Sequence, residues 1–192
     1  MTWKAFCFCL FFSFSANAAE DRLNIVASTS ILADMAKVVG GSKVDVSSII
    51  DPDTDVHSYE PTPNDLKKIA KADLIILNGL GLDSFVERIV KSSGTKAKIA
   101  TITNGITLIK NGQLADPHAW QSLKNAVYYA RNIELAICEL DKPNDPYYEA
   151  NTEKYIDELK KLGLQGAAAL LAQAEEQLLQ NQAIKKLFDT VQ

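Results

Sequence analysis

The chain contains two histidines, and each lies in a short acidic segment that includes proline. His57 lies within residues 53–61, and His118 lies within residues 116–120. Neutral imidazole is the commonest side-chain ligand for transition metals in proteins and binds zinc, manganese, iron and copper well. The prolines restrict the backbone, which suits a preformed site. The pattern therefore predicts that His57 and His118 bind one metal ion; two ordinary loop histidines are the alternative.

Three carboxylates accompany these histidines: Asp55 and Glu60 flank His57, and Asp116 precedes His118. A carboxylate often orients a metal-bound histidine by accepting its second ring N–H. We take these three residues as candidates for that role, with solvated loop acids and helix caps as the alternative. Two histidines alone make an incomplete site, because structural zinc takes four ligands and manganese favours additional carboxylate oxygen.

The segments around the histidines alternate between strand-like and helix-like patterns. Strands are predicted at 23–28, 44–50, 74–77, 97–102 and, as a short addition, 106–109, and helices at 31–39, 63–71, 83–91 and 122–140. This alternation predicts an α/β fold with a parallel sheet flanked by helices on both faces. Ligands of open α/β sheets bind beyond the carboxyl ends of the strands. Each histidine follows a strand and precedes a helix, so both are expected at that rim.

A different organisation is predicted after the α/β segments. Residues 147–162 have the spacing of a long amphipathic helix, the composition becomes rich in Ala and Gln beyond Gly163, and no strand-like run follows Asn111. We therefore expect a metal-binding lobe over 19–142, and a linking helix with an atypical helical tail over 143–192.

The first 18 residues are predicted to be a cleaved secretory signal. A cationic start precedes an apolar run over 5–15, and Ala16-Asn17-Ala18 provides a small-x-small cleavage site. The apolar run is too short to span a bilayer, although an uncleaved anchor is the alternative. No lipoprotein pattern is present, so a soluble exported protein is expected. Cleavage would leave Cys138 as the only cysteine, which excludes an intrachain disulfide and suits a buried apolar role.

Composition and motifs argue against several other functions. The net charge is −4 and no basic stripe is present, so no nucleic-acid partner is expected. Residues 78–82 lack the spacing and the lysine of a phosphate loop, and neither a Gly-x-Ser-x-Gly elbow nor a His-Glu-x-x-His motif is present. We predict a binding protein and no enzyme. Trp120, Tyr128 and Tyr129 are expected in the core.

The chain resembles the metal-binding receptors (solute-binding proteins) of bacterial ABC transporters for manganese, zinc and iron. The resemblance extends from about Asn24 to Leu162 in order and approximate spacing. The matching segments are 26–32, 55–63, 72–79, 116–120 and 148–151, followed by Tyr155.

The resemblance implies two α/β lobes joined by a rigid long helix, with a buried metal ion between them. His57 and His118 match the two ligands that the first lobe of the family supplies. The remaining ligands, a His or Glu and then an Asp or Glu, belong to the second lobe. The family pattern stops inside the linking helix, so we expect a receptor truncated to its N-terminal lobe; a shortened functional protein or a partial sequence is the alternative.

The resemblance also implies the cargo, the partner and the location. Manganese is favoured, because residues 110–115 lack the His-rich loop of zinc-dedicated members and the Tyr-Glu-Pro after His57 resembles the manganese and iron branch; zinc and iron stay open. The protein would capture the ion in the periplasm and deliver it to a membrane permease.

Two rival functions are kept. A repurposed lobe could act in adhesion through its helical tail, without metal transport and without any need for either histidine. A hydrolytic metalloenzyme would require an open metal position and a general base.

Overall fold

The computed structural model describes residues 22–106, 108, 110–111 and 114–166. The predicted signal peptide and most of the predicted tail lie outside these residues. Four strands form a parallel sheet in the order β2-β1-β3-β4. Their bounds are Leu23–Thr29 for β1, Val44–Ile50 for β2, Leu74–Leu77 for β3 and Lys98–Thr101 for β4. The predicted fold class is confirmed.

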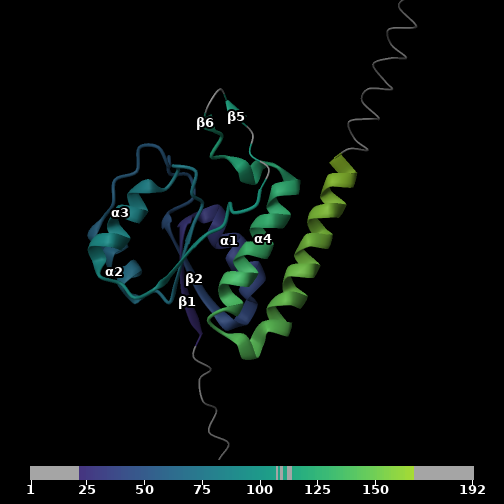
Figure 1. Cartoon of the computed structure of the whole chain (residues 1–192), viewed down its shortest axis with the longest axis horizontal. Helices are drawn as coiled ribbons and strands as arrows, with labels where there is room; N and C mark the ends of the chain where they lie inside the picture. Colours follow the sequence, from purple (N-terminus) through teal and green to yellow (C-terminus); the bar gives the residue numbers. More distant parts are fainter. Residues whose placement is uncertain (1–21, 107, 109, 112–113, 167–192) are drawn as a thin grey trace, which may run out of the picture.

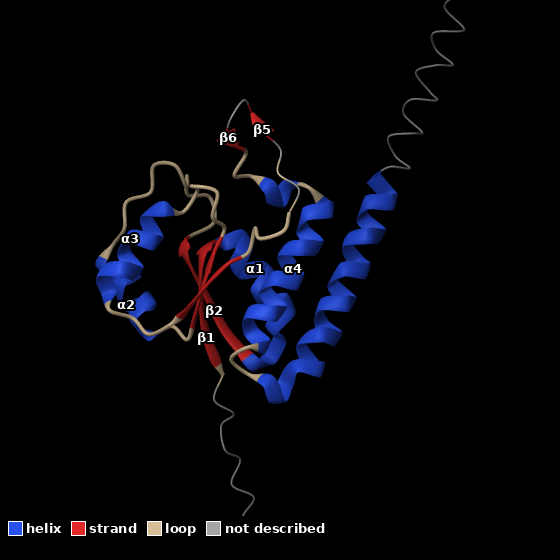
Figure 2. Ribbon diagram, in the orientation of Figure 1, coloured by secondary structure: helices blue, strands red, loops and turns tan. Residues whose placement is uncertain are grey.

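Helices cover both faces of this sheet. Helices α2 and α3 lie on one side, and α1 and α4 lie on the other (Figure 2). The α-helices are α1 Ser30–Gly40, α2 Pro63–Lys71, α3 Ser84–Ser93 and α4 Leu123–Cys138, and short 3-10 turns are η1 Gly41–Lys43, η2 Ala119–Gln121 and η3 Lys142–Asn144. The predicted helices are therefore present, with ends displaced by a few residues at most.

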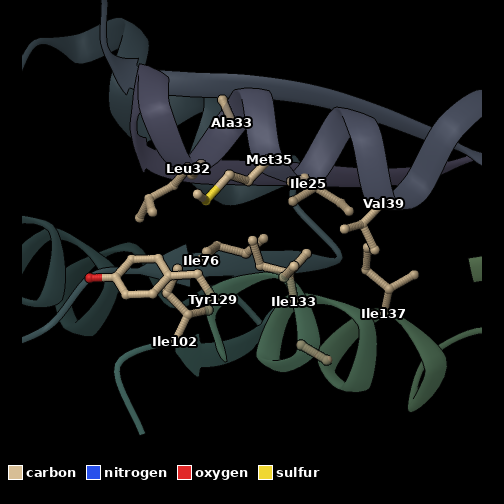
Figure 3. Packing of buried hydrophobic residues seen from close by; sticks show 14 of the residues in the cluster. Ile25, Leu32, Ala33, Met35, Val39, Ile76, Ile102, Tyr129, Ile133 and Ile137 are labelled. Atoms are coloured by element: carbon tan, nitrogen blue, oxygen red, sulfur yellow. The ribbon is translucent and has the colours of Figure 1, made fainter. Parts of the chain in front are cut away.

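The alternating direction of side chains along the strands creates two apolar cores. Ile25 and Ile76 point into the core shared with α1 and α4, which also contains Ile133 (Figure 3). Val26 and Ile75 point into the smaller core against α2 and α3. All five side chains are buried, and each full burial of this kind contributes about 1.5–3 kcal/mol. Two-sided burial explains why β3 is a continuous apolar run.

Polar caps fix the points at which the rim loops enter helices. The Thr29 hydroxyl accepts the backbone N–H of Leu32 at the start of α1. Thr62 and Asp65 form a capping box at the start of α2, with Pro63 in the first turn. The Ser122 hydroxyl accepts the backbone N–H of Asn125 at the start of α4.

A final helix covers residues 145–166 and packs beside α4 (Figure 1). Its buried residues Tyr148, Ile156 and Leu159 join the larger core. Two polar contacts fix its first turns: the Tyr147 hydroxyl accepts the backbone N–H of Ser42 at 3.0 Å, and the Asn151 amide donates to the Val39 carbonyl at 3.0 Å. The helix continues through Gly163 to residue 166, beyond the predicted end at Leu162.

The connection from β4 to α4 differs from the prediction. Ile106 and Leu108 are not in a strand. A small antiparallel hairpin instead pairs β5 Lys110–Asn111 with β6 Leu114–Ala115, so the expectation of no strand after Asn111 was wrong. Two residues, Gly112 and Gln113, separate these strands in the sequence, and a glycine at the first of two connecting positions is typical of a hairpin. Within the described ranges, no helix has the length and apolarity needed to cross a membrane.

Candidate metal site

The two histidines lie close together at the rim where the parallel strands end. His57 is in the loop between β2 and α2, and His118 is in the turn between β6 and α4. Their ring centroids are 5.5 Å apart, with an interplanar angle of 64°. The structure therefore brings together the two side chains that the sequence singled out. His57 is exposed and the His118 side chain is 34% exposed, so solvent and ions can reach both rings.

In both loops, an aspartate two residues before the histidine accepts the backbone N–H of that histidine. The Asp55 carboxylate accepts the backbone N–H of His57 at 2.9 Å, and the Asp116 carboxylate accepts that of His118 at 2.9 Å. These backbone hydrogen bonds lower the pKa of each aspartate below its ordinary value. Both carboxylates are therefore ionised at neutral pH.

The two aspartates differ in what else they bind. Asp116 Oδ1 also lies 2.8 Å from His118 Nδ1. An ionised carboxylate can only accept, so Nδ1 carries the proton and Nε2 keeps a free lone pair for a metal. The second oxygen of Asp55 instead accepts the Ser58 hydroxyl at 3.1 Å. Among the described residues, the His57 ring has no hydrogen-bond partner.

Tyr59 attaches the His57 loop to the sheet. Its hydroxyl lies 2.8 Å from Asp65 Oδ2 and 3.2 Å from the Ile49 carbonyl oxygen, both hydrogen-bond acceptors. Burial and the nearby Asp65 raise the pKa of Tyr59 to about 12, so the phenol stays protonated at neutral pH. Glu60 is exposed and makes no hydrogen bond or ion pair with another described residue. Tyr59 therefore supports this loop, although the sequence reasoning missed it. Glu60 makes no such contact with a described residue.

Aromatic side chains near His118 only partly match the expectation. Trp120 is partly buried against the larger core, and its ring lies 5.4 Å from that of His118. Tyr129 is fully buried, but Tyr128 is 41% exposed, so its expected core position was wrong.

Cys138 is only partly buried, and burial raises its thiol pKa to about 12, which keeps it a neutral thiol.

The amide side chains of two asparagines bind the His118 turn, and the sequence reasoning missed both. Asn78 donates to the Pro117 carbonyl at 3.0 Å, and Asn125 donates to the Ala119 carbonyl at 3.1 Å. The available signal was Asn78-Gly79 directly after an apolar strand, because polar residues at this position line the rim of a parallel sheet.

The described residues supply two candidate metal ligands. No cluster of three or more His, Cys, Asp or Glu suited to a metal ion occurs among them. An open hollow of about 720 Å³ lies at the opposite end of the sheet, near Asp73, Lys96 and Lys98, and contains neither histidine. The rim pair is therefore the candidate site, and it can offer two imidazole nitrogens to a divalent cation.

Comparison with known proteins shows which proteins the chain is similar to. Residues 25–184 match the family model described as "Zinc-uptake complex component A periplasmic". The chain is 35% identical over 174 residues to the iron ABC transporter substrate-binding lipoprotein MtsA of Streptococcus pyogenes, covering 84% of this chain and 56% of that protein. It is 36% identical over 159 residues to the manganese ABC transporter substrate-binding lipoprotein scaA of Streptococcus gordonii, covering 77% and 51%.

Solved structures show the same likeness. A Mn-bound periplasmic metal binding protein from candidatus liberibacter asiaticus superposes with a TM-score of 0.67 at 34% identity, covering 72% of this chain and 53% of that one. A crystal structure of ZnuA superposes with a TM-score of 0.69 at 30% identity, covering 74% and 56%. The chain thus spans about half the length of the relatives it matches.

Proposed function

We propose a function from one premise: this chain belongs to the family of the periplasmic zinc-uptake component, which includes substrate-binding proteins of metal ABC transporters. On that premise, the chain captures a divalent metal ion through His57 and His118 and delivers it to a membrane permease. Capture and release require no chemical turnover, so no catalytic residue is assigned.

The separation of the two imidazole rings carries this proposal. A metal–nitrogen bond of about 2.1 Å places a ring centroid about 3.2 Å from the ion, so two rings on one ion lie at most about 6.5 Å apart. The observed centroid separation of 5.5 Å satisfies this limit without any movement of the loops. The ionised Asp116 supports the same role, because it leaves His118 Nε2 free to bind.

Manganese is the favoured ion, with zinc or iron as alternatives. The relatives are named for iron and manganese, the solved neighbours include Mn-bound and Cd-bound structures, and the family model is named for zinc. Two nitrogens do not complete the shell of any of these ions. Water or groups outside the described residues complete it, and we expect weak binding where only water does so.

The proposed location is the periplasm. The matched family model is described as periplasmic, and the solved neighbours include periplasmic proteins. Residues 1–18 are proposed to act as the cleaved export signal.

Titration of Mn²⁺ into the purified protein tests the proposal, with the loss of the free Mn²⁺ paramagnetic resonance signal as the readout. One ion should bind per chain, and both His57→Ala and His118→Ala should bind it far more weakly than the wild type does. Glu60→Gln is the matched control. It changes a carboxylate of the same loop, and this carboxylate makes no hydrogen bond or ion pair with a described residue. Unchanged binding in both histidine variants would refute the assignment, and Zn²⁺ and Fe²⁺ titrated in parallel would rank the cargo.

A further inference from the structure

The residues on both sides of His118 are held through their backbone carbonyl groups by buried asparagine side chains. Asn78 is fully buried at the end of β3 and donates to the Pro117 carbonyl at 3.0 Å. Asn125 is 2% exposed in the first turn of α4 and donates to the Ala119 carbonyl at 3.1 Å. The residue before His118 is thus tied to the sheet, and the residue after it is tied to the helix.

Asn78 is itself fixed by the core. Its side-chain oxygen accepts the Tyr129 hydroxyl at 2.7 Å, and its backbone carbonyl accepts the Thr103 hydroxyl at 2.7 Å. Its backbone N–H donates to the fully buried Asp83. The orientation of the amide is determined, because the Pro117 carbonyl can only accept and therefore faces the NH₂ group. Figure 3 shows Tyr129 at the edge of the larger core with its hydroxyl directed away from the apolar side chains.

These contacts form a continuous path from the core to the His118 ring. Tyr129 orients Asn78, Asn78 and Asn125 hold the turn, and the turn presents the backbone N–H of His118 to Asp116, which also binds the ring nitrogen. A buried, fully paired polar network specifies one geometry, because any rearrangement leaves a buried polar group without a partner.

We propose that Asn78 and Asn125 are positioning residues that fix the His118 ring in its metal-binding orientation before any ion arrives. This inference rests on the proposed metal-binding function and deepens it. The expected consequence is a preorganised ligand: the ring need not be ordered when the ion binds, so affinity depends on two amides that never touch the metal.

The test compares Asn78→Ala and Asn125→Ala with Asn132→Ala in the full chain. Asn132 is a matched control, because it lies two turns further along α4 and its amide also donates to two backbone carbonyls, those of Ile102 and Asn104, in a segment without histidine. Thermal unfolding measures the structural cost of each variant. Asn125→Ala, which leaves the sheet untouched, serves if Asn78→Ala does not fold.

Two readouts separate positioning from stability. In the metal-free protein, ¹⁵N shifts of the imidazoles should show the His118 proton on Nδ1 in the wild type and in Asn132→Ala, and a mixture of tautomers in Asn78→Ala and Asn125→Ala. The Mn²⁺ affinity should fall about tenfold or more in the latter pair only. Wild-type ring shifts in a folded Asn125→Ala, or an equal change in Asn132→Ala, would overturn the inference.

The two proposals can fail separately. Absence of binding of Mn²⁺, Zn²⁺ and Fe²⁺ by the wild-type chain would refute the metal-binding function. The ring shifts of the metal-free variants would still show whether the two asparagines orient His118.

Discussion

The loops that carry His57 and His118 have the same local design but differ in how they are supported. In both, an aspartate two residues earlier accepts the backbone N–H of the histidine at 2.9 Å. Only Asp116 also holds the ring, and only the His118 turn is bound on both sides by buried amides. The site thus joins one oriented imidazole to a second whose ring has no hydrogen bond to a described residue. A fixed ligand can locate an ion while the other adjusts to it.

Removal of either imidazole should have the largest effect. His118→Ala and His57→Ala should each lower Mn²⁺ affinity by more than about 100-fold, because loss of an outer hydrogen-bond partner alone costs about 10- to 100-fold. The loss should be greater for His118→Ala, since the oriented ligand is then absent. Isothermal titration of both variants measures the difference. A clearly greater loss in His57→Ala would contradict the asymmetry.

The two aspartates offer a sharper test, because each can be replaced while its backbone contact is kept. Asp116→Asn should lower the affinity about 10- to 100-fold, since a neutral amide holds the protonated Nδ1 less strongly than a carboxylate does. Asp55→Asn should cost only a few-fold, because Asp55 does not bind the ring. Equal losses measured by the same titration would show that the contact between Asp116 and the His118 ring contributes nothing particular to metal affinity.

Two tyrosines support the two loops and should differ in their effect on stability. Tyr129→Phe should lower the free energy of unfolding by about 1–3 kcal/mol, because it leaves the buried Asn78 oxygen without a donor. Tyr59→Phe should cost about 0.5–1.5 kcal/mol, the usual net value of one hydrogen bond, at a less buried position. Urea unfolding provides the measurement. A larger loss in the free energy of unfolding for Tyr59→Phe would indicate that the contacts of the His57 loop contribute more stability than those of the His118 turn.

Alkaline pH should act on the His57 loop through Tyr59. The pKa of Tyr59 is raised to about 12 from an ordinary value of 10.0. The stability linked to this shift is fully present below pH 10 and is lost as the pH rises towards 12, because only the unfolded chain ionises in that range. Burial also raises the pKa values of Tyr129, Tyr148 and Tyr155, so the measurement is the difference in tyrosinate absorbance between the wild type and Tyr59→Phe, which should show a transition near pH 12. A Tyr59 transition near pH 10 would show that its contact with Asp65 is weak.

Most of the fold could be predicted from the sequence, because its elements have strong local signals. The continuous apolar run of β3 matches its burial on both faces of the sheet. The capping residues and the amphipathic spacing of α2 both indicate the helix that the structure shows there. The convergence of His57 and His118 could also be predicted, since loops after parallel strands share one rim. The hairpin β5–β6 was missed because two-residue strands are too short to show a period.

The unequal support of the two histidines could not be read from the sequence. Asp55-Val56-His57 and Asp116-Pro117-His118 have the same spacing, yet only one aspartate reaches the ring. The difference arises from contacts between segments far apart in the chain, such as Asn78 with Pro117. A pattern of neighbours along the sequence carries no information about which buried amide will meet which loop.

The direction of the helix over 145–166 has a consequence for any polypeptide attached to it. Its first turns are fastened at the base of the lobe by Tyr147 and Asn151, and it returns beside α4 for about 33 Å at 1.5 Å per residue. The helix therefore runs toward the same end of the lobe as the β5–β6 hairpin (Figure 1). The helix thus carries the chain from the base of the lobe to the end at which His57 and His118 lie.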